Sequence, residues 1–147
     1  MIKHILIFSC SVIVTSVIFN SCKKKEENTP PFIQFLSISP INVTQFIDPV
    51  TIKIHYEDAE GDLGHANPDS LTMFIHDSRL SDADSLHIPP LTPGMALSIK
   101  GEIDIDIGSP FLLGNGGSEY IKYTIKVRDN YGLWSNEIVT DEIEISP

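Results

Sequence analysis

The sequence predicts an all-β protein, and three runs of alternating residues carry this prediction. In each run the alternate side chains are apolar and often β-branched, apart from Gly101, while the side chains between them are polar or charged. The three runs are residues 50–57, 97–107 and 121–128. Alternation with a period of two gives a strand one buried face and one exposed face, and helical spacing is nowhere sustained. We therefore expect strands that each cover one side of a common core.

Four weaker segments bring the expected number of strands to seven. They are apolar but shorter or interrupted, and they lie at residues 33–39, 71–77, 86–88 and 138–145. Turn signals separate all seven segments, as in a sandwich of two antiparallel sheets. Asp141 interrupts the last segment, which predicts a bulge or a crossing between sheets. The expected architecture is a seven-stranded, two-sheet sandwich, and a small jelly roll or a calcium-dependent carbohydrate module is the alternative.

The first 21 residues are expected to be a signal peptide. Lys3 supplies a positive charge, and Ile5 to Phe19 is an uncharged apolar run. This run is shorter than the roughly 20 apolar residues that a transmembrane helix needs. The segment Phe19-Asn20-Ser21-Cys22 resembles the lipobox of bacterial lipoproteins. The resemblance implies cleavage before Cys22 and a covalent lipid on it, whereas Cys10 has too little of the apolar run before it. An ordinary secretory signal with an incidental cysteine is the alternative.

The residues after Cys22 bear on the location of the protein. Lys23-Lys24-Lys25 followed by Glu26-Glu27 resembles the short lysine-then-acidic export signals of lipoproteins in the Bacteroidetes. The resemblance implies a lipid anchor in the outer membrane and exposure at the cell surface, and a plain solvated tether is the alternative. The expected organisation is a signal peptide at 1–21, a lipidated flexible tether at 22–31 and one domain at 32–147.

The charge of the chain excludes some partners. From Cys22 onward there are 9 Lys and Arg against 20 Asp and Glu, which gives a net charge of −11. Binding of nucleic acid needs a basic surface, so we expect no nucleic-acid partner. Direct adsorption to anionic lipid is disfavoured for the same reason. We therefore expect membrane contact through the lipid on Cys22, and the acidic surface favours divalent cations.

Two loops carry a resemblance to a known fold family. The acidic segment Tyr56–Gly64 leaves the second strand, and Val127–Asn136 leaves the sixth. The latter looks like the D-N-x-G-x-W-S turn that joins the last two strands in many immunoglobulin-like domains. The chain resembles such domains of the fibronectin III or cadherin type. The resemblance implies that both loops lie at one pole, beside the start of the first strand and the tether.

Acidic side chains in these two loops form a candidate metal site. Clustered carboxylates raise their proton affinity or need a counter-cation, and Ca²⁺ accepts about six to eight oxygen ligands in irregular geometry. The segment fails to match an EF-hand loop and matches the cadherin acidic motif only in part. Asp-rich glycine turns also cap strands through backbone hydrogen bonds without a metal, and this alternative stays open. The candidate calcium ligands are Glu57, Asp58, Glu60, Asp62 and Asp129.

Loop aromatic and apolar residues are candidate binding residues. Trp134 either stacks on a sugar ring or folds over the end of the core, while Phe111 and Leu112 either contact a partner at the opposite pole or close the core there. The histidines have no ligand-like spacing, and no catalytic motif is present. Asp104 and Asp106 lie on an outward strand face with no sign of a cleft, which disfavours glycosidase chemistry.

We therefore expect a non-enzymatic, membrane-tethered module. Its function would be binding, adhesion or accessory assembly with an outer-membrane or cell-surface protein. A glycan-binding surface lipoprotein and a structural spacer are the two alternatives.

Overall fold

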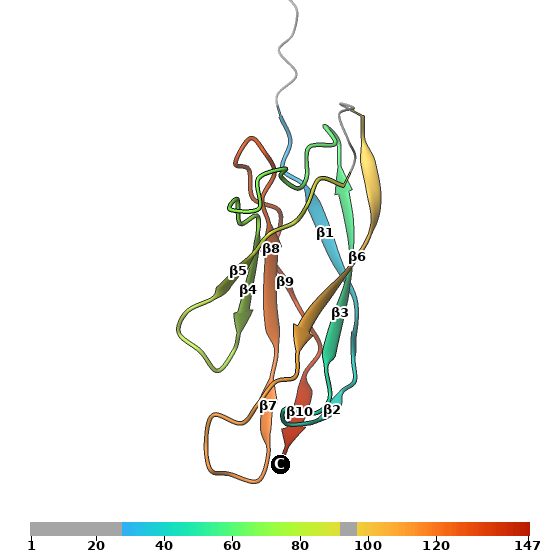
Figure 1. Cartoon of the computed structure of the whole chain (residues 1–147). Coiled ribbons are helices and arrows are strands. Elements are labelled where there is room, and N and C mark those ends of the chain that lie inside the picture. Colours follow the sequence, from blue (N-terminus) through green and yellow to red (C-terminus); the bar gives the residue numbers. More distant parts are fainter. Residues whose placement is uncertain (1–27, 92–96) are drawn as a thin grey trace, which may run out of the picture.

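The computed structural model describes residues 28–91 and 97–147, and this part of the chain is all-β without a helix (Figure 1). Accordingly, no helix in these ranges is long and apolar enough to cross a membrane. The expected signal peptide, Cys22 and most of the expected tether lie outside the described residues. The strands are β1 (Phe32–Ser39), β2 (Asn42–Thr44), β3 (Val50–Asp58), β4 (Met73–Asp77), β5 (Asp84–Leu86), β6 (Ile99–Gly108), β7 (Glu119–Ile121), β8 (Tyr123–Val127), β9 (Ile138–Val139) and β10 (Ile143–Ser146).

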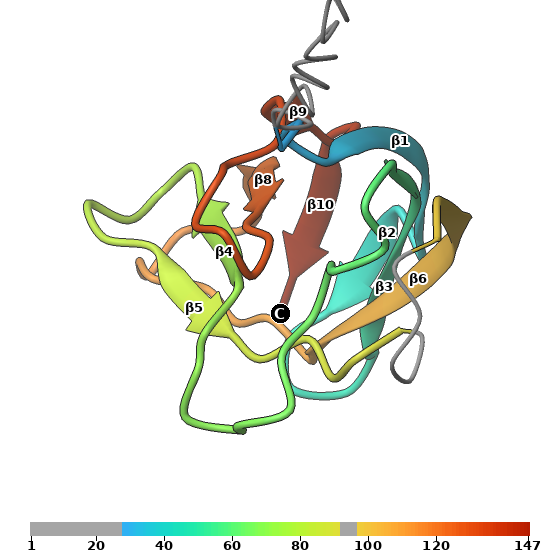
Figure 2. The ribbon, with the colours of Figure 1, turned by 90° about the horizontal axis from the view of Figure 1, so that it is seen from above.

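The strands form three sheets that make two facing layers. One layer is the antiparallel sheet β1-β3-β6. The other layer contains the antiparallel sheet β5-β4-β8-β9, and the small sheet β2-β10-β7 continues it where β7 leads into β8 and β9 into β10 (Figures 1 and 2). The arrangement is consistent with a β-sandwich.

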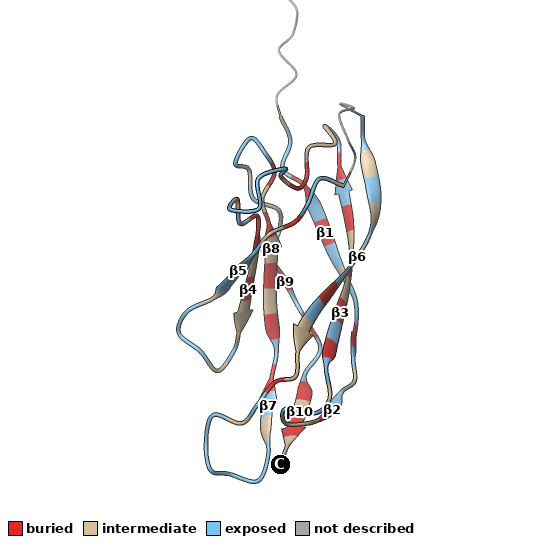
Figure 3. Cartoon of the chain, viewed as in Figure 1, coloured by how far each residue is buried: buried red, intermediate tan, exposed pale blue. Residues whose placement is uncertain are grey.

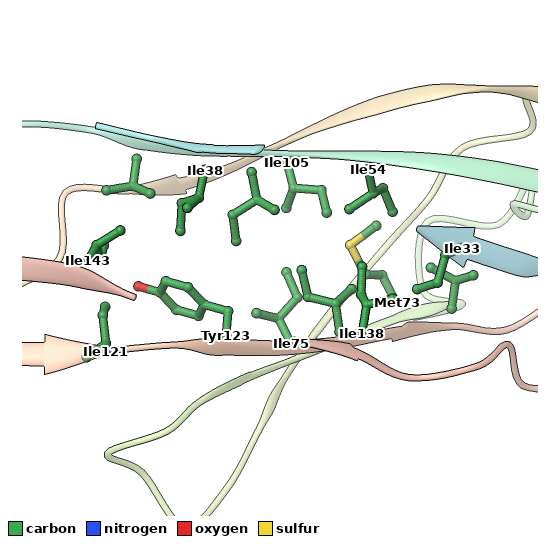
Figure 4. Close-up of a cluster of buried hydrophobic side chains, with 14 of the residues drawn as sticks. Ile33, Ile38, Ile54, Met73, Ile75, Ile105, Ile121, Tyr123, Ile138 and Ile143 are labelled. Carbon is green, nitrogen blue, oxygen red and sulfur yellow. The ribbon is translucent and has the colours of Figure 1, made fainter. Parts of the chain in front are cut away.

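The core lies between the two layers, as the burial pattern in Figure 3 shows. In β3, Val50, Ile52 and Ile54 are 0% exposed, and the residues between them face outward. Ile125 and Val127 of β8 are equally buried from the facing layer. Figure 4 shows the isoleucine side chains of both layers pointing toward one another. Burial of each such side chain contributes about 1.5–3 kcal/mol, so the alternation seen in the sequence is the main source of the fold's stability.

The structure divides two of the predicted strands where the chain passes from one sheet to another. The predicted strand at 121–128 becomes β7 and β8, because the backbone of Lys122 leaves the ladder and bonds to Ser78 instead. The Lys122 N–H donates to Ser78 Oγ, and the Ser78 N–H donates to the Lys122 carbonyl. The predicted strand at 138–145 becomes β9 and β10, which belong to different sheets. The expected interruption at Asp141 is therefore a change of sheet.

Two further differences concern short strands. β2 was not expected, because Val43 is its sole buried residue; it forms a parallel ladder with β10. The segment predicted at 86–88 begins earlier, as β5. Ile88 turns into the core instead of continuing the strand, and its N–H donates to Thr72 Oγ1 at 3.2 Å. With these changes the described chain has ten strands where the sequence predicts seven.

Candidate functional site

The two loops that resemble those of immunoglobulin-like domains meet at one pole of the molecule. One follows β3 and the other follows β8, and Leu63 forms an isolated β-bridge with Asp129 between them. β1 begins at the same pole (Figure 1). Thr29 lies there as well, since its N–H and Oγ1 both donate to the Glu60 carboxylate at 3.0–3.1 Å. We call this end of the domain the acidic pole.

Asp58 caps the end of β3. Its side chain is buried, at 2% exposure, and accepts hydrogen bonds from the N–H groups of Glu60, Asp62 and Leu63 at 3.2, 2.9 and 2.7 Å. The turn that makes this possible needs a glycine at Gly61, where φ is +70° and a Cβ would lie 2.0 Å from the Leu97 carbonyl oxygen. Asp58 thus makes the backbone hydrogen bonds that the capping alternative describes.

Asp129 caps a turn in the second loop, and only one of its two carboxylate oxygens has a hydrogen-bond partner among the described residues. Its Oδ1 accepts a hydrogen bond from the Leu133 N–H at 2.8 Å, and the two backbones pair as well. The residue is 3% exposed, yet its Oδ2 is buried without a hydrogen-bond partner within the described chain. A buried carboxylate oxygen of this kind costs free energy unless a donor or a cation reaches it.

Asp62 lies between these caps with both carboxylate oxygens buried and, among the residues described, unpartnered. The pKa of Asp62 is raised to about 6, mainly by burial and in addition by repulsion from Asp58 and Asp129. As carboxylates, Asp58 and Asp62 can only accept hydrogen bonds, whereas a protonated Asp62 can donate to its neighbour. Asp62 therefore takes up a proton near pH 6, well above the range in which a carboxylate ordinarily does so.

The structure brings together three of the five candidate calcium ligands. Asp58, Asp62 and Asp129 converge, but Glu60 is bonded to Thr29, and Glu57 is exposed with its Oε1 3.2 Å from His55 Nε2. No group of three or more His, Cys, Asp or Glu in the described ranges is arranged to hold a metal ion. Calcium at this pole stays a prediction, and it requires a rearrangement of the three aspartates.

We expect Asp62→Asn to raise the melting temperature near neutral pH, with a gain that vanishes near pH 4. The pKa of Asp62 is raised from 3.8 to about 6, so the folded state holds the extra proton and the free energy of unfolding falls as pH rises through this window. A shift of this size corresponds to at most about 3 kcal/mol, and solvent screening lowers the expected gain to about 1–2 kcal/mol.

Thermal unfolding followed by circular dichroism across this pH range measures the effect. Asp69→Asn is the matched control, because Asp69 is an exposed acid in the same long loop and its removal changes the net charge equally. A pH-independent difference between Asp62→Asn and the native protein would contradict the assignment. Millimolar CaCl2 distinguishes neutralisation by a calcium ion from neutralisation by a proton. Bound calcium would raise the melting temperature of the native protein but not of Asp62→Asn.

The aromatic and apolar candidates are placed differently from one another. Phe111 is exposed at the opposite pole and stacks on Phe46, with ring centroids 5.5 Å apart and planes 5° apart. Leu112 packs against the core, so of the two neighbours it is the one that closes the sandwich. Trp134 lies on the outward side of β8 and contacts Phe74 rather than the core.

Sequence reasoning missed Phe46 and Arg79, which shape the opposite pole. Phe46 and Ile47 occupy a turn just before Asp48-Pro49, and two large apolar residues at a turn were a usable signal of surface function. Arg79 gave no such signal, because its importance depends on two ion pairs. It forms one with Asp77 at the end of β4 and one with Glu119 at the start of β7.

Arg79 also borders an open groove of about 360 Å³ between β5 and the end of β6. Its lining combines apolar side chains, among them Ile75, Leu86 and Ile107, with the carboxylates of Asp84 and Asp106. Tyr123 reaches the groove from β8, and burial raises the pKa of its hydroxyl to about 12. The hydroxyl therefore stays protonated and able to donate.

Comparison of the chain with protein-family models, with curated proteins and with solved structures finds no match.

Proposed function

We propose that the chain is a lipid-anchored, immunoglobulin-like module that binds or assembles with a partner protein through the pole opposite its tether. The anchor in this proposal is a lipid on Cys22 at the outer membrane, and the role is non-enzymatic. The observation that carries the proposal is the chemical difference between the two poles of the sandwich.

In this proposal the tether joins the domain at the acidic pole. Beyond the hydrogen bonds between Thr29 and Glu60, the Asn136 side chain accepts from the Ile33 N–H at 2.9 Å and donates to the Ile33 carbonyl at 2.8 Å. Thr29 and the start of β1 are thus held at the acidic pole, and a tether that precedes them would join the domain there. A domain anchored in this way presents its other pole away from the membrane.

The opposite pole carries an exposed apolar surface, which we call the distal tip and which consists of Phe46, Ile47, Phe111 and Leu113. Phe46 and Ile47 are each 69% exposed, and Phe111 and Leu113 are about half exposed. Isolated exposed apolar residues are ordinary, but a group formed by two loops is typical of a protein-binding surface. The groove beside β5 opens next to it, since Phe111 and Leu113 line both.

The exposure of Phe46 is built into the local backbone. The turn is closed by hydrogen bonds from the Thr44 N–H to Asp48 Oδ2 at 2.8 Å and from the Phe46 N–H to the Pro110 carbonyl at 3.1 Å. Phe46 has a φ of +62° and is the one non-glycine residue of the described chain with a positive φ. Such a conformation costs about 1–2 kcal/mol in a bulky residue, so the fold sustains strain to hold this ring outward.

Co-purification from membranes solubilised in detergent tests the proposed role. The native lipidated chain should retain a stoichiometric partner that the double variant Phe46→Ser, Phe111→Ser loses. Leu97→Ser is the matched control, because Leu97 is also exposed but lies beside Gly61 at the acidic pole. Retention of the partner by the tip variant, or loss of it by the control, would contradict the proposal.

Substitution of Cys22 tests the proposed lipid anchor separately. Cys22→Ser should abolish incorporation of radioactive palmitate and move the protein from the membrane fraction to the soluble fraction. Acyl chains contribute about 0.8 kcal/mol per buried CH₂, so their loss removes stable membrane binding from a strongly acidic chain. Cys10→Ser is the control and should label and fractionate as the native protein does. Equal labelling of both variants would show that Cys22 is not the acylated residue.

A further inference from the structure

A second surface, on the outward side of the sheet β5-β4-β8-β9, combines aromatic rings with positive charge. Phe74 lies in β4 and pairs with Lys126 of β8. Arg128 follows β8 directly and forms an isolated β-bridge with Trp134. We call these four residues the cationic-aromatic face. It is separate from the distal tip and adjoins the acidic pole, because Arg128 and Trp134 are the chain neighbours of Asp129 and Leu133.

The four side chains of this face contact one another closely. The Phe74 and Trp134 rings meet edge to face, with centroids 6.5 Å apart and planes at 79°. Lys126 Nζ lies 4.8 Å from the centroid of Phe74 and 5.0 Å from that of Trp134. Arg128 Cζ lies 5.4 Å from the Trp134 centroid. These contacts order two long cationic side chains in advance, which lowers the entropy that a ligand must overcome.

The charges of this face are unusual for the domain. Residues 28–147 contain 18 Asp and Glu but only six Lys and Arg. Three of the six are paired with carboxylates within 4 Å, namely Lys53, Arg79 and Lys122. Lys100, Lys126 and Arg128 have no carboxylate within that distance among the described residues. Two of these three cations thus converge on the chain's single tryptophan, in a domain with ample acid to neutralise them.

We propose that the cationic-aromatic face binds an acidic sugar, meaning a carboxylated unit of a polysaccharide. The apolar side of the sugar ring would lie on the exposed part of Trp134, which is 41% exposed, beside Phe74. The carboxylate would lie between Lys126 Nζ and the Arg128 guanidinium, and both hydrogen bonds there are charge-assisted. A neutral sugar would form no charge-assisted hydrogen bond with either cation.

Trp134 supplies the readout, because it is the only tryptophan in the chain. The full lipidated chain, in a detergent without a sugar headgroup, is titrated with a short oligomer of galacturonic acid. A galactose oligomer of the same length and a tetraglutamate peptide are titrated in parallel. We expect a saturable change of Trp134 fluorescence with the galacturonate oligomer, and at least a tenfold weaker response to the other two.

Variants locate the site. The double variant Lys126→Gln, Arg128→Gln should weaken galacturonate binding by about tenfold or more, because two charge-assisted contacts are lost. Lys100→Gln removes an exposed, equally unpaired cation from β6 and should bind as the native protein does. Calorimetry on Trp134→Phe, which removes the fluorophore, should show weaker binding as well. Melting temperatures of all variants verify folding.

Several results would overturn the proposal. An equal response to the neutral oligomer would show that the cations do not select the ligand. An equal response to tetraglutamate would assign the face to acidic peptides. The proposal also fails if the double variant binds like the native protein, or if no saturable response develops with the galacturonate oligomer.

Discussion

Replacing Arg79 with alanine is expected to lower the free energy of unfolding by about 2–3 kcal/mol and to release the loop that carries Phe111. The guanidinium donates to Asp77 Oδ1 and Oδ2 at 3.1 and 2.7 Å, to Glu119 Oε2 at 2.6 Å and to the Phe111 carbonyl at 2.9 Å. All three charged side chains are mostly buried. The alanine variant leaves the carboxylates of Asp77 and Glu119 without their cation. The free-energy cost of these unpaired charges exceeds the net stabilisation that the ion pairs provide.

Glu119 connects this network to the distal tip. It accepts hydrogen bonds from the N–H groups of Leu113 and Gly114 at 3.1 and 2.7 Å, and these bonds, together with Arg79, hold the pKa of Glu119 below its ordinary value. Arg79 and Glu119 therefore fix the backbone on both sides of Leu112. Without Arg79, we expect Phe111 to lose its stacking on Phe46, so the variant should also lose any partner that the tip binds.

Urea unfolding followed by far-ultraviolet circular dichroism measures the stability effect. Arg79→Lys keeps the charge but lacks the planar guanidinium that forms two hydrogen bonds with Asp77. Its free energy of unfolding should therefore lie between those of the native protein and the alanine variant. Lys53→Ala is the matched control, because its ion pairs with Glu102 and Asp104 lie on an exposed strand face and should contribute nothing measurable. Equal midpoints for Arg79→Ala and Lys53→Ala would contradict the role given to Arg79.

The sequence predicted the fold class and most buried positions because these depend on a local pattern. Alternation in β3 and β8 needs no knowledge of the partner strand, and every apolar residue of both strands points inward as expected. The alternation does not indicate where a strand ends its pairing with one neighbouring strand and begins pairing with another. Lys122 continues the alternation, but Ser78 draws its backbone out of the ladder, and Ser78 is 44 residues away in sequence.

The same division applies to the candidate site. The resemblance to immunoglobulin-like domains implied that the acidic loops meet beside the first strand, and they do. The sequence analysis did not rank the acidic residues, although the alternation of β3 places Asp58 on the buried face and Glu57 on the exposed one. The contacts of Phe46 with Phe111 and of Lys126 with Phe74 and Trp134 join loops and strands that lie far apart in the chain. Such contacts become visible only in the folded structure.

Asp58→Ala is expected to lower the free energy of unfolding by about 3 kcal/mol, although it removes one of three mutually repelling carboxylates. Two effects of the substitution oppose each other. The loss of Asp58 leaves three N–H groups without their acceptor, and that of Leu63 is buried. Each such hydrogen bond to a charged group contributes about 1.5–3 kcal/mol. The relief of repulsion on Asp62 is smaller, because burial is the main cause of its raised pKa.

The pH dependence of stability separates these two effects. Removing the charge of Asp58 should lower the pKa of Asp62 toward its ordinary value, so the fall in stability between about pH 4 and pH 6 should become shallower in Asp58→Ala. Asp58→Asn keeps one acceptor oxygen and should lose less stability while flattening the pH profile equally. Glu57→Ala is the control, since Glu57 is exposed and accepts none of these backbone bonds. If Asp58→Ala unfolds at the same urea concentration as Glu57→Ala, Asp58 does not cap β3, and the acidic pole owes its conformation to the packing of Leu63 alone.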